Sequence, residues 1–305
     1  MAAFSASDLA FEGFRITRER PGWVLAWALL LGLLQLATLY MLGTMAGSAL
    51  NELQAASSGS QPDPQRMMAA YSQMAPAYSI IVPLSLLLQA VLGCAIYRAV
   101  LRPQEKSLLG MRVGGDELRV LVVSIALALL LGVIVFIGAL VLGLVAGGVG
   151  AAAGDGGAAG VVALVLGLAL LGVLIFFGVR LSLALPMTFD QKDFRVFESW
   201  RATQGSFWPL LGAYLLAFIL GILVTLLLTI VLVAVGAGLL LAFGQQLEGA
   251  LSAMQDPTRM MEAALPVLLV YGFANGVIGA VFTVIITAPA AAAWRRLSGP
   301  EKAFA

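Results

Sequence analysis

Six long stretches of this sequence contain no charged side chain, and they constrain the fold more than any other feature. Each is at least as long as the roughly 20 residues that a helix needs to cross about 30 Å of hydrocarbon. Because backbone groups in lipid must pair within their own segment, we expect helices in these stretches. The predicted spans lie near residues 22–45, 76–101, 118–147, 159–188, 206–243 and 263–294.

The composition agrees with a chain that is solvated by lipid. Hydrophobic residues make up 61% of it and charged residues only 11%, whereas about 25% charged residues is usual for a soluble domain. We therefore predict an all-α fold, a polytopic bundle of six transmembrane helices with short interfacial amphipathic helices, in a single membrane domain over 1–305. The net charge of +1 gives no basic field for nucleic acid.

Two boundaries need separate treatment. The glycine-rich segment 147–160 makes a poor helix interior, so we expect a short loop there between an antiparallel pair of helices. The fifth span, 206–243, would rise about 57 Å as a helix. It must therefore tilt, extend past the bilayer, or break near Gly236 and Gly238.

The basic residues predict the orientation. Of the 17 Lys and Arg residues, 15 fall on the side of the chain that holds both termini and the second and fourth connections. Short cytoplasmic segments retain basic residues, so both termini are predicted to be cytoplasmic. A cleaved signal peptide is the competing interpretation of the first span. We favour an uncleaved anchor, because the apolar run exceeds a signal core and the arm before it is mixed in charge.

A short pattern recurs along the chain. Residues 11–17 read FEGFRIT, residues 197–203 read FESWRAT, and LLGMRVG at 108–114 lies halfway between them. Each copy precedes a span that leaves the cytoplasmic side. We predict three parallel two-span repeats, about 5–102, 103–188 and 190–298, around a pseudo-threefold axis. The shared arginines are Arg15, Arg112 and Arg201.

The segments that begin the repeats are predicted to be helices on the inner membrane surface. In the first, Asp8, Glu12, Arg15 and Glu19 would form one charged stripe. Glu and Arg three residues apart recur as Glu12/Arg15 and Glu198/Arg201, which are candidate ion pairs. These helices either anchor the protein or bind anionic lipid headgroups through their arginines.

The clearest resemblance lies between Arg180 and Trp208. RLSLALP at 180–186 and SWRATQGSFW at 199–208 resemble the membrane domain of bacterial glycerophosphodiester phosphodiesterases and related uncharacterised six-span inner-membrane proteins. The resemblance implies a bacterial inner membrane. It does not imply the catalytic activity, because that activity belongs to a separate barrel domain that contains histidines. This chain is too short to include that barrel and contains no histidine.

The residues for chemistry are scarce. The chain has no histidine and one cysteine, Cys94, so no transition-metal cluster is expected. The carboxylates are expected at the cytoplasmic surface, with Asp116 and Glu117 capping the third span. General acid–base catalysis usually needs histidines or tuned carboxylates. We therefore expect neither an enzyme nor a cofactor.

The polar residues within the spans leave two interpretations open. Gln35, Gln89 and Asn275 would line a polar path in a permease or channel, or they would form hydrogen bonds between helices. Glycines four residues apart would allow close helix contact, mostly within the chain. These pairs are Gly43/Gly47, Gly143/Gly147, Gly156/Gly160 and Gly272/Gly276.

Arg180 is expected two turns before the end of its span. It either extends toward the inner interface or marks a headgroup pocket beside Ser182 and Trp200. The leading hypothesis is a non-enzymatic inner-membrane protein that binds membrane lipids, or a membrane or cytoplasmic protein, through its cytoplasmic helices. The alternative is a small-solute permease or channel. The oligomeric state stays open.

Overall fold

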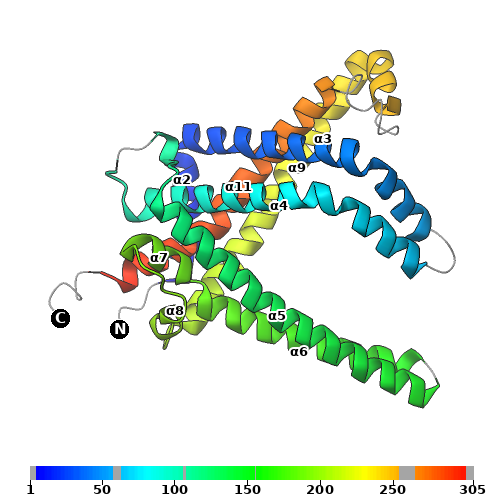
Figure 1. Cartoon of the computed structure of the whole chain (residues 1–305). Helices are drawn as coiled ribbons and strands as arrows, with labels where there is room; N and C mark the ends of the chain where they lie inside the picture. Colours follow the sequence, from blue (N-terminus) through cyan, green and yellow to red (C-terminus); the bar gives the residue numbers. More distant parts are fainter. Residues whose placement is uncertain (1–4, 58–62, 106–107, 155, 254–264, 300–305) are drawn as a thin grey trace. The chain divides into compact units, whose positions relative to one another are not determined.

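A computed structural model of the chain describes residues 5–57, 63–105, 108–154, 156–253 and 265–299. These residues are helical with no strand among them, which confirms the all-α class. The long helices are α3 (Pro21–Ser57), α4 (Pro64–Leu101), α5 (Gly115–Ala153), α6 (Gly156–Leu181), α9 (Phe207–Ala253) and α11 (Leu265–Leu297) (Figure 1).

In the described part of the chain, six helices are long and apolar enough to cross a membrane. They coincide with the six predicted spans, so the protein is a multi-pass membrane protein. The fifth span does not break at Gly236 or Gly238, because α9 is helical through both glycines. Residues 263 and 264 of the sixth predicted span lie outside the described residues.

The chain divides into two units, which are described separately. Unit 1 comprises Met1–Glu12, Gly93–Leu216 and Ala288–Ala305, and unit 2 comprises Gly13–Leu92 and Ala217–Thr287. The helices α4, α9 and α11 contribute residues to both units. The three predicted repeats stay a prediction. Arg15 belongs to unit 2, whereas Arg112 and Arg201 belong to unit 1.

Unit 2 contains a close helix crossing that depends on glycine. A Cβ atom added to Gly276 in α11 would lie 2.1 Å from the carbonyl oxygen of Ala28 in α3. A Cβ atom added to Gly32 would lie 2.7 Å from the carbonyl oxygen of Gly272. The predicted close contact at Gly272/Gly276 is therefore confirmed. At five glycines of the other predicted pairs, an added Cβ atom would meet no described atom within 4 Å. These are Gly43, Gly143, Gly147, Gly156 and Gly160.

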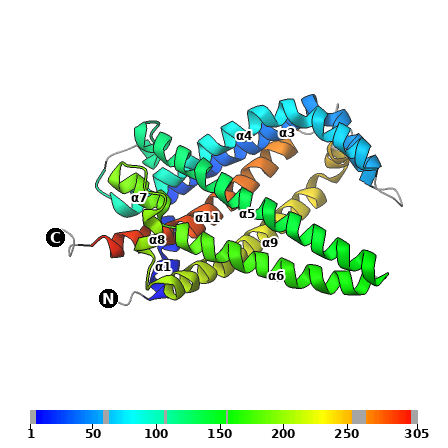
Figure 2. The same ribbon diagram turned by 60° about the horizontal axis from the view of Figure 1, so that its bottom comes forward.

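In unit 1, α5 and α6 form a long antiparallel hairpin (Figures 1 and 2). The predicted loop over 147–160 is wrong in extent, because α5 continues to Ala153 and α6 begins at Gly156. The small residues continue both helices instead of breaking them, and at one close contact a Cβ atom on Gly150 would lie 3.2 Å from that of Ala159. Gly154, at φ 68°, closes α5 in the left-handed conformation that glycine adopts freely.

The fourth predicted span, 159–188, is not one helix. It ends at Leu181, and α7 (Ala184–Gln191) follows a turn at Ser182 and Leu183. Pro186 gives the physical reason, because a proline ring clashes with the carbonyl group four residues earlier in a continuous helix. That carbonyl belongs to Ser182. The break turns a buried segment, which includes Leu183 and Phe189, back into the core of unit 1.

The first predicted interfacial helix is also two helices. They are α1 (Ala6–Ala10) and α2 (Glu12–Glu19), separated at Phe11. The third predicted interfacial helix is the short α8 (Glu198–Ala202). The middle one is a single 3-10 turn, η1 (Leu108–Gly110), in which Leu109 has φ 56°.

Candidate functional site

The two segments that carry the family resemblance meet in unit 1. Ser199 of α8 is fully buried. Its hydroxyl group donates to the carbonyl oxygen of Arg180 at 2.8 Å and accepts from the amide of Leu183 at 3.2 Å. Thr203 donates to the same carbonyl at 3.4 Å. The last carbonyl groups of a helix have no partner within it, so α8 completes the hydrogen bonding of α6 at its broken end.

This arrangement holds the side chain of Arg180 among aromatic rings. Its guanidinium carbon lies 5.5 Å from the ring centre of Phe176, 5.6 Å from that of Trp200 and 5.6 Å from that of Phe207. The rings also contact one another edge-on, and Phe176 and Trp200 have centres 5.5 Å apart. Each such cation–ring contact contributes about 0.5–2 kcal/mol, more when water is excluded. We call Arg180 with Phe176, Phe177, Trp200 and Phe207 the Arg180 cluster.

The charge of Arg180 has no counter-charge among the described residues. Its Nε and Nη1 atoms are buried, and neither has a hydrogen-bond acceptor within the described residues. The residue as a whole is only partly buried, and its third guanidinium nitrogen, Nη2, is not among the buried atoms that lack a partner. An arginine side chain keeps its proton in proteins, so the cluster carries a permanent positive charge.

The hydroxyl groups around the cluster are already engaged. Tyr214 of α9 donates to Ser182 at 2.8 Å, and Ser182 donates to the carbonyl oxygen of Val179 at 2.8 Å. Ser182 therefore does not contact the guanidinium by a hydrogen bond, although the sequence placed it in the same pocket. The structure brings Arg180 and Trp200 together as predicted neighbours.

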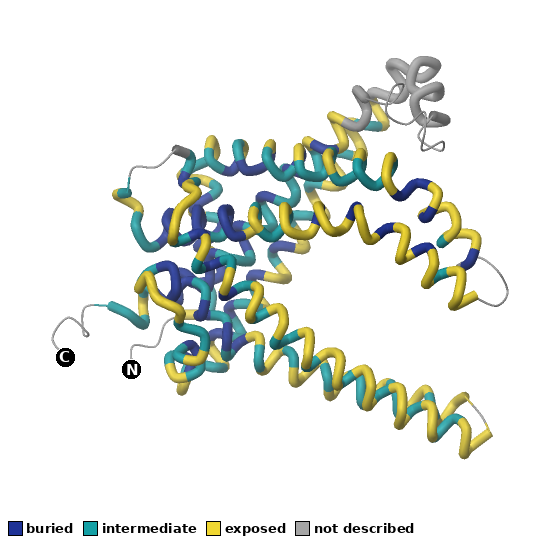
Figure 3. The backbone as a smooth tube through the Cα atoms, in the orientation of Figure 1, coloured by how far each residue is buried: buried dark blue, intermediate teal, exposed yellow. Residues whose placement is uncertain are grey.

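Large aromatic side chains lie exposed beside the cluster. Phe197 is 74% exposed and Trp208 is 76% exposed. The ring centre of Trp208 lies 5.4 Å from that of Phe207, so the aromatic contacts run continuously from Arg180 to the surface of unit 1. Most large apolar side chains along α5 and α6 are also exposed (Figure 3). In a membrane protein these faces are the ones that lipid covers.

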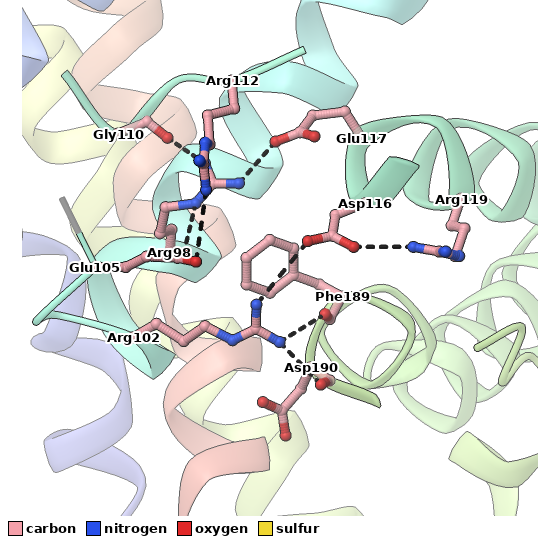
Figure 4. A network of polar contacts seen from close by, with 10 residues as sticks. All are labelled: Arg98, Arg102, Glu105, Gly110, Arg112, Asp116, Glu117, Arg119, Phe189 and Asp190. Atoms are coloured by element: carbon pink, nitrogen blue, oxygen red, sulfur yellow. Dashed lines mark hydrogen bonds and ion pairs between the residues drawn. The ribbon is translucent and has the colours of Figure 1, made fainter. Parts of the chain in front are cut away.

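A second buried arginine lies in unit 1, at the end of α4 (Figure 4). Arg98 is 2% exposed, and its Nη2 atom lies 2.8 Å from the carboxylate of Glu117, which is itself 3% exposed. Its Nε atom lies 3.1 Å from the carboxylate of Glu105, and its Nη1 atom donates to the carbonyl oxygen of Gly110. We call this set the Arg98 network.

The network extends to α7 and α11. Arg102 donates to the carbonyl oxygens of Phe189 at 3.3 Å and Asp190 at 3.0 Å, as Figure 4 shows. The indole N–H of Trp294 donates to the carboxylate of Asp190 at 2.9 Å. Together with Arg102, Asp190 and Trp294, the Arg98 network therefore connects four separate segments of the chain in the core of unit 1.

Asp116 and Glu117 lie in the first turn of α5, as predicted, but neither of them caps the helix by a side-chain hydrogen bond. The residue before α5 is Gly114, and no side chain caps this helix end. Glu117 is buried against Arg98, and Asp116 pairs with Arg119 at 2.9 Å. Glu117 is buried within the protein because a buried cation lowers the cost of burying an anion. The predicted position of these carboxylates at the cytoplasmic surface stays a prediction.

The charges of the N-terminal segment also have partners far along the chain. Glu12, which is 6% exposed, lies 3.1 Å from Arg295, and Asp8 lies 3.3 Å from Arg296. These ion pairs fasten α1 to the end of α11 within unit 1. Two members of the predicted charged stripe therefore contact protein.

The three arginines of the predicted repeat have different surroundings. Arg15 is exposed on α2. Arg112 lies 3.6 Å from Glu105, which also binds Arg98. Arg201 is exposed on α8, and it has no ion pair within the described residues. The predicted Glu198/Arg201 pair is wrong, because Glu198 pairs with Arg195 instead. Binding of a headgroup by these three arginines stays a prediction.

The residues of the predicted polar path all belong to unit 2. Asn275 donates to the carbonyl oxygen of Tyr271 on its own helix at 2.9 Å. Gln89 is exposed on α4, and Gln35 is partly buried on α3. The polar path stays a prediction.

Sequence reasoning missed the two residues that are most deeply buried as charges. Arg98 lies within the predicted second span, and Glu117 lies one residue before the third. An ionisable residue within a span is a signal for a partner in the interior, and this signal pointed to Arg98.

No family model matches the chain, and neither a curated protein nor a solved structure is similar to it.

Proposed function

We propose that this protein is a non-enzymatic membrane protein that binds the phosphate group of an anionic lipid at the Arg180 cluster. The observation that supports the proposal is the uncompensated charge of Arg180. A buried charge is costly unless it is paired. Since no described residue provides an anion here, an external anion that reaches the guanidinium group of this partly buried residue would supply it.

The surroundings of the cluster favour a lipid over a soluble anion. Arg180 lies in the last turn of α6, next to apolar faces that need lipid as their solvent. Phe197 and Trp208 are exposed at the same end, and aromatic side chains of this kind are enriched at membrane interfaces. The distribution of basic residues predicts that this end faces the cytoplasm, so the lipid would belong to the inner leaflet.

We also propose a distant relationship to the membrane domain of bacterial glycerophosphodiester phosphodiesterases. The two segments that carry the resemblance are the ones that build the Arg180 cluster. A shared lipid site would explain why the resemblance is sharpest in these two segments.

The proposal is tested by measuring thermal stability of the purified protein in a neutral detergent. Phosphatidylglycerol should stabilise the wild type, because a ligand that binds only the folded state adds about 2.7 kcal/mol at a hundredfold excess over its dissociation constant. Arg180→Gln should lose most of this stabilisation. Inorganic phosphate at the same concentration should give none.

Arg66→Gln is the control, since it removes the same charge from an exposed arginine that pairs with Asp63 in unit 2. It should keep the stabilisation by phosphatidylglycerol. Equal stabilisation of wild type and Arg180→Gln would disprove the lipid site. An equal effect of inorganic phosphate would show a soluble anion site instead.

A further inference from the structure

We infer that the Arg180 cluster selects lipids whose headgroup is anionic and carries no amine, such as phosphatidylglycerol, over phosphatidylethanolamine. The inference rests on the proposed function and adds the class of headgroup to it. Both lipids carry the same phosphodiester group. They differ in that the ethanolamine headgroup adds an ammonium group only a few bonds from the phosphate.

The aromatic rings of the cluster offer no place for that ammonium group. Ring faces attract cations, but Arg180 already lies over Phe176, Trp200 and Phe207 at 5.5–5.6 Å. A second cation brought to the same rings would be repelled by the guanidinium group. Like charges a few ångströms apart disfavour each other strongly where water is excluded.

The nearest carboxylates in the sequence are already neutralised. Glu198 directly precedes Ser199 and Trp200, and it pairs with Arg195. Asp193 lies 3.2 Å from the same guanidinium group. An ammonium group bound beside the cluster would therefore have to compete with Arg195 for either carboxylate.

The polar groups that remain cannot replace a carboxylate. The hydroxyl groups of Ser182, Ser199 and Thr203 each donate to a backbone carbonyl, and Tyr214 donates to Ser182. The oxygens of these hydroxyl groups can still accept, but they carry no charge. The donors without a partner at the cluster, among the described residues, are Nε and Nη1 of Arg180. Donors and a positive charge match the oxygens of a phosphate and the hydroxyl groups of glycerol, and they do not match an ammonium group.

The test uses the full-length protein in bilayer nanodiscs that contain equal amounts of phosphatidylglycerol and phosphatidylethanolamine. Native mass spectrometry after release into detergent measures the lipids that stay bound. The wild type should retain phosphatidylglycerol in at least about tenfold preference, which corresponds to about 1.4 kcal/mol. Arg180→Gln should lose the retained phosphatidylglycerol, whereas Arg66→Gln, which alters an exposed arginine, should keep it.

Different results would disprove the lipid site and the headgroup selectivity. If Arg180→Gln retains as much of both lipids as the wild type, the lipid site itself is wrong. If the retained lipid depends on Arg180 but comprises both classes equally, the lipid site stands and the headgroup selectivity is wrong.

Discussion

Two arginines of unit 1, the buried Arg98 and the partly buried Arg180, have opposite electrostatic surroundings. Arg98 and Arg180 both lie near the end of an apolar helix, and both lie near aromatic rings, with Phe189 5.4 Å from Arg98. Arg98 has two carboxylates and a backbone carbonyl as partners. Arg180 has only rings around its buried nitrogens. The described residues thus neutralise one guanidinium group internally, whereas we propose that an external anion neutralises the other.

The contrast separates a structural charge from a binding charge. Removing a partner of a paired, buried cation should unfold the protein, because the remaining charge is then uncompensated. Removing an unpaired cation should change the free energy of unfolding little, but it should weaken the binding of anionic lipid a great deal. Three substitutions test this difference.

Glu117→Gln should have the largest effect on stability. It leaves Arg98 buried with only Glu105 as a counter-charge, so the free energy of unfolding should fall by about 3 kcal/mol or more. Chemical denaturation in mixed micelles, followed by circular dichroism, measures the change. Asp63→Asn is the control. It removes the exposed pair with Arg66, keeps a residue that can cap α4, and should cost less than about 1 kcal/mol. Equal losses would contradict a structural role for the Arg98 network.

Ser199→Ala should have an intermediate effect. The substitution leaves the amide of Leu183 without an acceptor in a buried site, which costs about 1–3 kcal/mol. It also loosens α8, so the stabilisation by phosphatidylglycerol should weaken. Ser85→Ala is a matched control, because Ser85 only donates to the carbonyl oxygen of Ile81 on its own helix. If both alanine variants keep the same stability, α8 does not depend on this hydroxyl group.

Arg180→Met should have the smallest effect when no anionic lipid is present. The loss of contacts with the rings is offset by removal of a buried, unpaired charge, so the change should stay within about 1 kcal/mol in either direction. The same denaturation experiment in a neutral detergent measures it. A loss as large as that for Glu117→Gln would mean that Arg180 is a structural charge, and the contrast between the two arginines would disappear.

The sequence predicted the helices better than it predicted their ends. Gaps between charges locate a span reliably, because lipid excludes unpaired charge over its whole thickness. They do not locate a turn. Ser182 and Leu183 break the fourth span within an apolar run, and the cause is the proline four residues after Ser182. The glycines near Gly150 were expected in a loop, but they continue both helices, with one close contact between Gly150 and Ala159.

The candidate site was predictable in its members but not in its electrostatics. The resemblance pointed to Arg180 and Trp200 because both lie in the segments that carry it. Whether an arginine has a counter-charge depends on residues brought near by the fold. Arg98 and Glu117 are 19 residues apart and join across a chain reversal, and no periodicity in the sequence marks such a pair. For the same reason, the sequence could not indicate that Arg180 has no such partner.

The α5–α6 hairpin has a consequence for the kind of bilayer the protein can occupy. With 39 residues, α5 is about 58 Å long, nearly twice the roughly 30 Å of hydrocarbon. Its last residues, 146–153, and the first residues of α6, 156–160, are Ala and Gly with one Val. Such residues gain little free energy in hydrocarbon and lose little in water. We therefore expect the tip to move across the membrane boundary as bilayer thickness changes. Hydrophobic mismatch, which sorts other proteins between thin and thick membranes, would then affect this hairpin little.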